Sequence, residues 1–213
     1  MPYIEGLEEM DITSLRKALK SAASVVNVDN VNWPDAFPYA PDCKALVARS
    51  RESLAVSFDV SGMDLRATQM EDNQRSWEDS CCEFFIQGGS DEYFNIEITC
   101  IGSILMAKGS GRNGRIQLSN SDVAKIKRWS SLEKKQYLEE GGNFSWNVTV
   151  LIPFTLLGLD PDNLPDQLSG NFYKCADLSA HPHFLSWSPI DTENPDFHRP
   201  EFFGKLFFNI LAI

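Results

Sequence analysis

Hydrophobic and polar residues alternate along much of the chain from residue 53 onward. Successive side chains of a β-strand point to opposite faces of a sheet, so this alternation predicts strands with one buried face. Four segments show the pattern most clearly. The residues expected to face a core are Leu54, Val56, Phe58 and Val60, then Phe94, Ile96 and Ile98, then Trp146, Val148, Val150 and Ile152, and finally Leu206, Phe208 and Ile210.

Glycine-containing segments separate the predicted strands. Such segments are typical of hairpin turns and other short connections, which join neighbouring antiparallel strands. They are Ser61-Gly62, Gly88-Gly89, 109–114 and Gly141-Gly142.

Good helix formers gather in two places, at 12–22 directly after Asp11 and at 132–140. Two short helices are too few to supply the crossovers of a doubly wound α/β fold. The sequence therefore predicts an all-β fold: a two-sheet antiparallel β-sandwich, jelly-roll-like, with one or two short helices.

The chain has 213 residues, of which 43% are hydrophobic, with 14 Phe and 5 Trp among them. A β-sandwich of this length commonly forms one domain with enough apolar material for its own core. No low-complexity segment or linker divides the sequence. We therefore expect one domain over residues 1–213, with residues 1–30 as an N-terminal extension packed on it.

Acidic residues outnumber basic ones by 30 to 19, which gives a formal net charge of −11. This charge repels phosphate groups, so neither nucleic acid nor an anionic membrane is an expected partner. No stretch reaches the roughly 20 apolar residues that span a bilayer, and the acidic N-terminus is unlike a signal peptide. The sequence as it stands predicts a cytoplasmic protein; an extracellular or periplasmic location would require a signal peptide that has been removed.

The cysteines are odd in number, and two of them are adjacent. Adjacent cysteines suit neither an ordinary disulfide nor a CxxC metal site. We therefore expect reduced, mostly buried thiols at Cys43, Cys81, Cys82, Cys100 and Cys175.

The segment WEDSCCEFFI combines an aromatic side chain with a strand that carries a carboxylate. If this strand pairs with the next one through a turn at 88–92, Glu83, Asn95 and Glu97 form a hydrogen-bonding floor with Trp77 as its wall. A sugar needs both, because its hydroxyls take hydrogen bonds and its C–H face packs on an aromatic ring. Two alternatives remain open: a solvated outer sheet face, and a glycosidase that uses the two carboxylates as a catalytic pair.

A second segment, 171–208, is rich in proline and aromatic residues and is expected to form ligand-contacting loops. Its candidate ligand-binding residues are Lys174, Trp187 and Arg199. All three histidines of the chain also lie here and could form a metal site, unless backbone or acidic groups bind them instead. These histidines are His181, His183 and His198.

The remaining chemistry in the sequence is sparse. The acidic loop 160–163 could offer oxygens to a structural Ca²⁺, although it lacks the ligand spacing of an EF-hand. The chain has no GxSxG, P-loop, Rossmann or HExxH motif. No firm cofactor is therefore expected.

Four segments together are similar to a known family: WEDSCCEFFI, then 93–112, 171–190 and 195–208. They resemble the family 9-like carbohydrate-binding modules found in many Bacteroidetes proteins, over most of the chain from about Asn32. The resemblance implies a sandwich of two antiparallel sheets, a sugar site on one face or rim, and structural metal ions that are often Ca²⁺.

The resemblance also assigns roles to residues. Trp77 matches the first of two tryptophans that sandwich a sugar in the xylanase modules of this family, and Glu83 matches a hydrogen-bonding glutamate. Asn95 and Glu97 stand where those modules have an arginine and an asparagine, so the polar chemistry differs. Trp187 is the candidate for the second tryptophan.

These observations favour non-catalytic carbohydrate binding, linked to polysaccharide or oligosaccharide utilisation. One alternative is a glycoside hydrolase-like enzyme that uses Glu83 and Glu97. The other is a scaffold or interaction domain with a decayed sugar site, in which Trp77 and Trp187 would be buried in the core.

Overall fold

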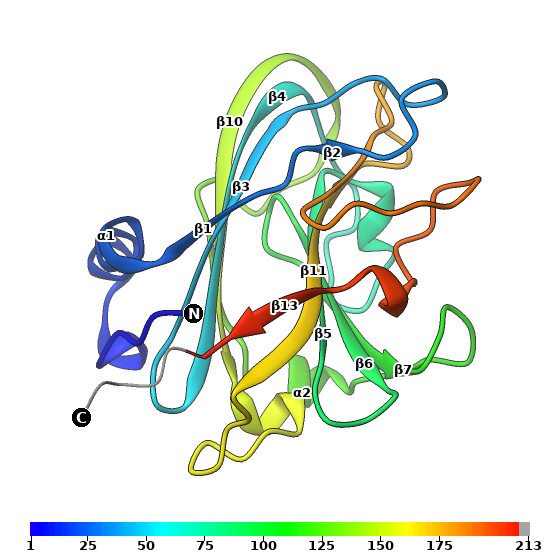
Figure 1. Cartoon of the computed structure of the whole chain (residues 1–213). Helices are drawn as coiled ribbons and strands as arrows, with labels where there is room; N and C mark the ends of the chain where they lie inside the picture. Colours follow the sequence, from blue (N-terminus) through cyan, green and yellow to red (C-terminus); the bar gives the residue numbers. More distant parts are fainter. Residues whose placement is uncertain (209–213) are drawn as a thin grey trace.

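Two antiparallel β-sheets pack face to face in the computed structural model, which describes residues 1–208 (Figure 1). The predicted all-β sandwich is therefore confirmed. The five-stranded sheet has the order β1-β3-β4-β10-β9. Its strands are β1 (Ser24–Asn27), β3 (Asp42–Arg49), β4 (Ser53–Ala67), β9 (Lys127–Ser130) and β10 (Tyr137–Pro153).

The eight-stranded sheet has the order β2-β12-β11-β5-β6-β7-β8, and β13 also pairs with β11. Its strands are β2 (Asn30–Val31), β5 (Cys81–Gln87), β6 (Tyr93–Thr99), β7 (Ile104–Gly109), β8 (Ile116–Gln117), β11 (Gln167–Cys175), β12 (Phe184–Ser186) and β13 (Gly204–Phe207).

Helical segments are short. The α-helices are α1 (Ile12–Ala22) and α2 (Asn120–Val123), and single 3₁₀ turns are η1 (Leu7–Glu9), η2 (Ser76–Glu78), η3 (Phe154–Leu157) and η4 (Pro200–Phe202). Within residues 1–208, none of these helices has the length and apolar character needed to cross a membrane.

The core lies between the two sheets and includes the described positions that the alternation predicts, of which Phe94 is only partly buried. Phe58 of β4 and Phe84 of β5 both contact Phe172 of β11, with ring centroids 6.3 and 6.1 Å apart. Trp146 is 5% exposed in the same cluster. Of the predicted core positions, Ile210 lies outside the described residues. All five cysteines are buried free thiols, as expected from the sequence.

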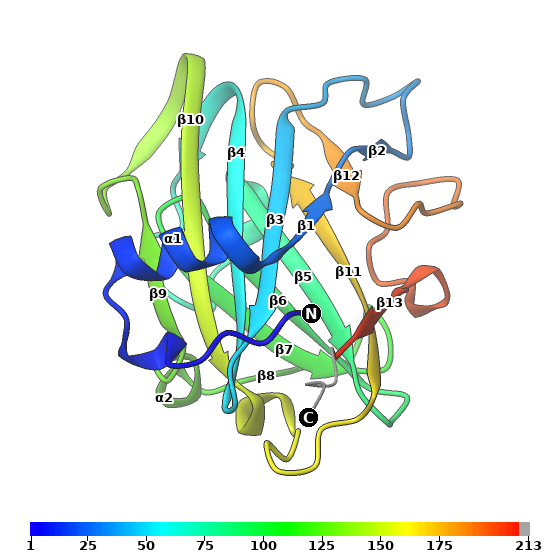
Figure 2. The same cartoon turned by 60° about the vertical axis from the view of Figure 1, so that its left-hand side comes forward.

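The helix predicted at 12–22 is confirmed to the residue. Asp11 caps it by accepting a hydrogen bond from the Ser14 amide at 2.9 Å. Leu15 and Leu19 are fully buried against the outer face of the five-stranded sheet. Figure 2 shows α1 lying across this face, so the helix covers the side of the sheet that the core does not.

The helix predicted at 132–140 is wrong, because β10 begins at Tyr137 and pairs with β4. The turn predicted at Gly141-Gly142 is also wrong. These glycines lie inside β10, where its register against β4 shifts, and Gly142 has a φ of 129°. Glycine tolerates such a backbone without the clash that a side chain would cause.

The turn predicted at Ser61-Gly62 is wrong as well, since both residues lie within β4. A Cβ atom on Gly62 would be 2.4 Å from the Tyr39 hydroxyl and 2.7 Å from Pro41. Gly62 is therefore required by a close approach of another segment. The connections predicted at Gly88-Gly89 and 109–114 are confirmed, between β5 and β6 and between β7 and β8.

Replacement of Trp146 by alanine should lower the free energy of unfolding by about 3–5 kcal/mol, because it empties a buried position between the sheets. Urea unfolding followed by circular dichroism would measure this. The control is Ile116→Ala, at a side chain 72% exposed, which should change the stability by less than about 0.5 kcal/mol. A similar small change for Trp146→Ala would contradict its place in the core.

Candidate functional site

Strand register brings the three predicted floor residues together on the outer face of the eight-stranded sheet, the face away from the core. Glu83 of β5 pairs directly with Glu97 of β6 and, on its other side, with Tyr173 of β11. Asn95 shares this face because it lies two residues before Glu97. A cavity of about 610 Å³ lies over these side chains. The pairing predicted through the turn at 88–92 is therefore confirmed.

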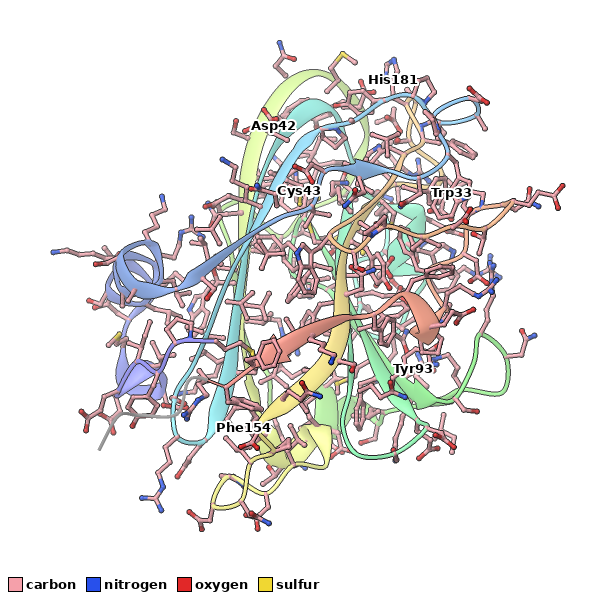
Figure 3. The ribbon with its side chains drawn as sticks, viewed as in Figure 1. Trp33, Asp42, Cys43, Tyr93, Phe154 and His181 are labelled. Carbon is pink, nitrogen blue, oxygen red and sulfur yellow. The ribbon has the colours of Figure 1, made fainter. Side chains whose placement is uncertain are left out.

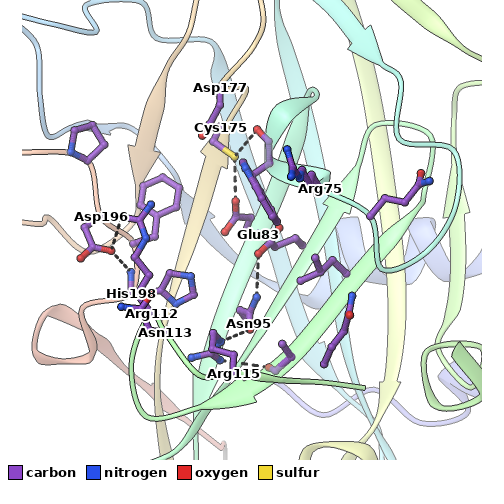
Figure 4. Close-up of a pocket in the computed structure, with 18 of the residues that line it drawn as sticks. Arg75, Glu83, Asn95, Arg112, Asn113, Arg115, Cys175, Asp177, Asp196 and His198 are labelled. Carbon is purple, nitrogen blue, oxygen red and sulfur yellow. Dashed lines mark hydrogen bonds and ion pairs between the residues drawn. The ribbon is translucent and has the colours of Figure 1, made fainter. Parts of the chain in front are cut away.

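The outer face is buried rather than solvated. Glu83, Asn95 and Glu97 are 3%, 2% and 4% exposed, so the alternative of a solvated sheet face is wrong. Loops and side chains from distant parts of the sequence cover these strands and form the walls of the cavity (Figure 4). Burial leaves each polar group dependent on a partner within the protein or a ligand.

Arg115, in the connection between β7 and β8, extends the hydrogen-bonding floor. Its Nε donates to Asn95 Oδ1 at 2.8 Å, and its terminal nitrogens donate to the carbonyls of Tyr93 and Gly111 at 2.8 Å each. Its guanidinium also lies 4.2 Å from the centroid of the Tyr93 ring. Asn95 Nδ2 in turn donates to Glu97 Oε1 at 2.9 Å. This role could not be predicted from the sequence, because the segment 109–114 and its neighbours have only the composition of a hairpin loop.

The carboxyl groups that line the cavity have raised pKa values. Burial, together with Cys175 and Glu97 nearby, raises the pKa of Glu83 well above its usual range. Burial also raises the pKa of Glu97 to about 7, against the effect of the hydrogen bond from Asn95. The pKa of Asp177, which follows β11 and lines the cavity, is raised to about 6, again mainly by burial. The Cys175 thiol donates to Glu83 Oε1 at 3.0 Å.

Trp77 lines the cavity from η2, as the sequence predicts for a wall residue. Two contacts position it. The Asp177 amide donates to the Trp77 carbonyl at 3.0 Å. The buried Asp79 carboxylate accepts from the amides of Thr68 and Gln69, both at 2.7 Å, which fixes the segment after η2 to the end of β4. Hydrogen bonds therefore hold the wall at Trp77 itself and at Asp79, directly after η2.

Trp187 does not reach this cavity. It follows β12, where Phe184 and Ser186 point to the outer face and Leu185 points to the core. Trp187 lies two residues after Leu185 and therefore points to the same side, the core. Its ring packs on Phe172 with centroids 5.8 Å apart. Phe184 lines the cavity instead and supplies an aromatic surface in addition to Trp77.

Lys174 is also placed on the core side, since the flanking Tyr173 and Cys175 face outward. Its Nζ lies 2.8 Å from His183 Nε2 and donates to the Cys175 carbonyl at 2.7 Å. Burial and Lys174 lower the pKa of His183 to about 2, so this imidazole is neutral. The structure therefore does not bring Lys174 to the candidate floor.

Arg199 lies outside the cavity lining and forms an ion pair with Glu201 at 2.5 Å. Its neighbour His198 does line the cavity, and its Nδ1 lies 2.9 Å from the Tyr93 hydroxyl. Burial, with Arg115 and Arg112 nearby, lowers the pKa of His198 to about 3.

The three histidines do not come together. His181 is bound to Asp64 at the end of the molecule opposite Tyr93, where His198 lies (Figure 3). Within residues 1–208, one group of three potential metal ligands has its ligand atoms within 4.8 Å of one another, formed by Cys81, Glu83 and Cys175.

This thiol-rich group does not fit Ca²⁺, which prefers carboxylate and carbonyl oxygens. In the acidic loop 160–163, the Asp162 carboxylate pairs with Arg51 at 2.9 Å. The described residues therefore bring together no set of three carboxylates for the structural Ca²⁺ that the family resemblance implies.

Further lining residues were not identified from the sequence. Alternation along β7 could have placed two of them, because Leu105 and Ala107 pair with Glu97 and Asn95 and share their face. Most of the others come from loops, and three come from β8, β11 and β12; their approach to the cavity depends on the fold. They are Asn73, Gln74, Arg75, Arg112, Asn113, Arg115, Gln117, Cys175, Asp177, Phe184, Pro195, Asp196 and Phe197.

The pKa of Glu97 predicts a specific pH dependence of stability. Since the folded-state pKa of about 7 exceeds the usual value of 4.5, the folded protein retains a proton that the unfolded chain releases between these values. The contribution of Glu97 to the free energy of unfolding is therefore fully present below about pH 4.5 and is lost as the pH rises through about 7. Glu97→Gln should remove that loss, on the order of 1–3 kcal/mol.

The free energy of unfolding, measured across this pH range for the wild type and Glu97→Gln, checks this prediction. Glu5→Gln, at an exposed position, is the matched control for the removal of one carboxylate. Equal pH slopes for the wild type and Glu97→Gln would contradict the raised pKa.

Comparisons with known proteins identify a family and a fold. The model of carbohydrate-binding family 9 matches residues 14–208. A crystal structure of a protein from Bacteroides uniformis ATCC 8492, proposed to bind carbohydrate, is 34% identical with a TM-score of 0.89, over 98% of this chain and 97% of that one. A search of curated proteins gave no match.

Two structures of a family 9 module from Caldicellulosiruptor kristjanssonii share the fold at low identity. The complex with cellotriose is 11% identical with a TM-score of 0.55, over 97% of this chain and 92% of that one. The complex with glucose is 12% identical with a TM-score of 0.50, over 87% and 83%. Since the family model matches nearly the whole chain, the protein belongs to carbohydrate-binding family 9.

Proposed function

We propose that the protein binds carbohydrate without cleaving it, in the cavity over the outer face of the eight-stranded sheet. The observation that carries this proposal is the combination of an aromatic wall and a buried polar floor. Trp77 and Phe184 line the cavity together with Glu83, Asn95 and Glu97. Such a site can pack the C–H face of a sugar ring while its polar groups bind hydroxyls.

The chemistry of the floor suits a polyhydroxylated ligand. Carboxyl oxygens accept hydrogen bonds from hydroxyls, while a protonated carboxyl can also donate one. The raised pKa values of Glu83 and Glu97 give this floor both capacities near neutral pH. Each such bond exchanges a water contact for a protein contact at small net gain. We therefore expect dissociation constants from about millimolar to micromolar, roughly −4 to −8 kcal/mol.

Family membership and the similar proteins support the same function. The Bacteroides uniformis protein, 34% identical over nearly the whole chain, is itself proposed to bind carbohydrate. The family 9 module bound to cellotriose and to glucose has the same fold. An oligosaccharide or the end of a polysaccharide is therefore the ligand we propose, and polysaccharide or oligosaccharide utilisation is the process that such binding would serve.

The geometry of Glu83 and Glu97 disfavours the glycosidase alternative. The catalytic carboxyls of a glycosidase flank the scissile bond from different sides. Here the two residues pair directly on adjacent strands, so both approach a ligand from the floor of the cavity. The scaffold alternative expects both tryptophans in the core: Trp187 does pack there on Phe172, whereas Trp77 lines the cavity, where a ligand can reach it.

Replacement of Trp77 by alanine should weaken sugar binding at least about tenfold, because the ring loses its packing surface. The stability should fall by much less than for Trp146→Ala. Isothermal titration calorimetry with xylo-, cello- and manno-oligosaccharides, compared with urea unfolding, separates the two effects. Trp129→Ala, in β9 of the other sheet, is the control and should bind like the wild type. Unfolding of Trp77→Ala would show that Trp77 is structural.

Chromatography of each oligosaccharide after prolonged incubation with the protein tests the absence of cleavage. We expect saturable binding and no new products. Products that disappear in Glu83→Gln or Glu97→Gln would assign catalytic roles to these carboxyls and overturn the proposal.

A further inference from the structure

The cavity contains more hydrogen-bond acceptors than the protein satisfies. Glu97 is 4% exposed and lines the cavity, yet its Oε2 has no hydrogen-bond partner within residues 1–208. Its other oxygen accepts one bond, from Asn95. Asp177 lines the same cavity, and its carboxylate makes no hydrogen bond or ion pair with the described residues. A buried acceptor left without a donor is costly, so the site is incomplete without a ligand.

The cations around the cavity are already engaged elsewhere. Arg112 pairs with Asp196 at 3.6 Å, and Arg75 pairs with Glu78 at 3.2 Å. Arg115 directs its donors to Asn95 and to backbone carbonyls. Within residues 1–208, no ion pair involves any of the three carboxyls Glu83, Glu97 and Asp177. These three carboxyls therefore lack an ion-pair partner in this part of the chain, and nearby cations act on them only through space, Arg115 on Glu97 and Arg112 on Asp177.

The three carboxyls also lie close enough to act on one another. Glu97 and Asp177 both contribute to raising the pKa of Glu83, and Asp177 contributes to raising the pKa of Glu97. Carboxyl groups that repel each other in a buried site favour a bound cation, which removes the repulsion and gains charge-assisted hydrogen bonds.

We propose that the preferred ligand is an amino sugar, a saccharide whose free, protonated amine is held by Glu97 and Asp177. This inference rests on the proposed carbohydrate binding and names the class of sugar. The amine supplies the missing donors to Glu97 Oε2 and to the Asp177 carboxylate. The ring packs on the wall that contains Trp77, whose face also attracts a cation.

A neutral sugar fits this charge pattern less well. A hydroxyl can bond to Glu97 Oε2, but an ammonium adds to that bond the attraction between its full positive charge and the carboxylates. An N-acetylated amine carries no charge, so it forfeits the electrostatic gain. An acidic sugar would place a further negative charge beside Glu83, Glu97 and Asp177.

Calorimetric titrations with glucosamine, N-acetylglucosamine, glucose and glucuronate, and with the β-1,4-linked trimers of the first three, test this inference at neutral pH. Each of the other monosaccharides differs from glucose at a single position of the same ring. Glucosamine and its trimer should bind about tenfold more tightly than their neutral counterparts. Because a bound cation lowers the carboxyl pKa values, their binding should also release protons, seen as a heat that depends on the buffer.

Variants assign the preference to particular carboxyls. Glu97→Gln should bring the ratio of glucosamine to glucose affinity close to one. Asp177→Asn, at a less buried position, gives a second measurement if Glu97→Gln folds poorly, and should also reduce the ratio. Asp91→Asn, in the exposed turn between β5 and β6, is the control for a change in overall charge and should keep the wild-type ratio.

The outcomes separate this inference from the proposed function. Neutral sugars that bind as tightly as glucosamine would overturn the amine preference and leave carbohydrate binding intact. Tightest binding of glucuronate would overturn it in favour of recognition by the arginines. Failure of every sugar in this panel and of the xylo- and manno-oligosaccharides would overturn both proposals.

Discussion

The pairing of β5 with β6 places two glutamates side by side on a buried sheet face, and the rest of the site follows from that constraint. Glu83 and Glu97 cannot both be fully charged there without a partner, since burial penalises the charged form of each. The protein partly compensates with a thiol from Cys175 and an amide from Asn95, which Arg115 holds in turn. Glu97 Oε2 is not compensated in this way, because it is buried without a hydrogen-bond donor among residues 1–208. A ligand with a hydrogen-bond donor would satisfy this oxygen.

Different elements cover the outer faces of the two sheets. On the five-stranded sheet, α1 presents leucines to an apolar surface and leaves a closed interface. On the eight-stranded sheet, the cover is made of η2, the β7–β8 connection and the segment before β13, which approach from different directions. These separate loops surround a cavity, whereas the single helix packs directly on the five-stranded sheet. The elements that cover each sheet therefore determine where the cavity lies.

Hydrogen bonds fix the loops that surround this cavity in place. Asp79 binds two backbone amides at the end of β4, and the Asp177 amide binds the carbonyl of Trp77. Arg115 connects its own loop to β6 through two acceptors, Asn95 Oδ1 and the Tyr93 carbonyl. Ligand-contacting groups supported in this way lose little freedom on binding, which favours affinity in an otherwise weakly binding polar site.

The sequence by itself determined the fold class, the α1 helix with its Asp11 cap, the alternating core positions, and the grouping of Glu83, Asn95 and Glu97 on one face. These are local properties, set by a strand period of two, by cap chemistry and by one short hairpin. Only the tertiary structure decided that this face is buried, that Phe184 rather than Trp187 shares the cavity with Trp77, and that Lys174 points to the core. It also decided that Arg115 reaches the floor and that His198 lies apart from the other two histidines. These features depend on strand order and on the approach of loops distant in sequence, and neither leaves a periodic signal in the chain.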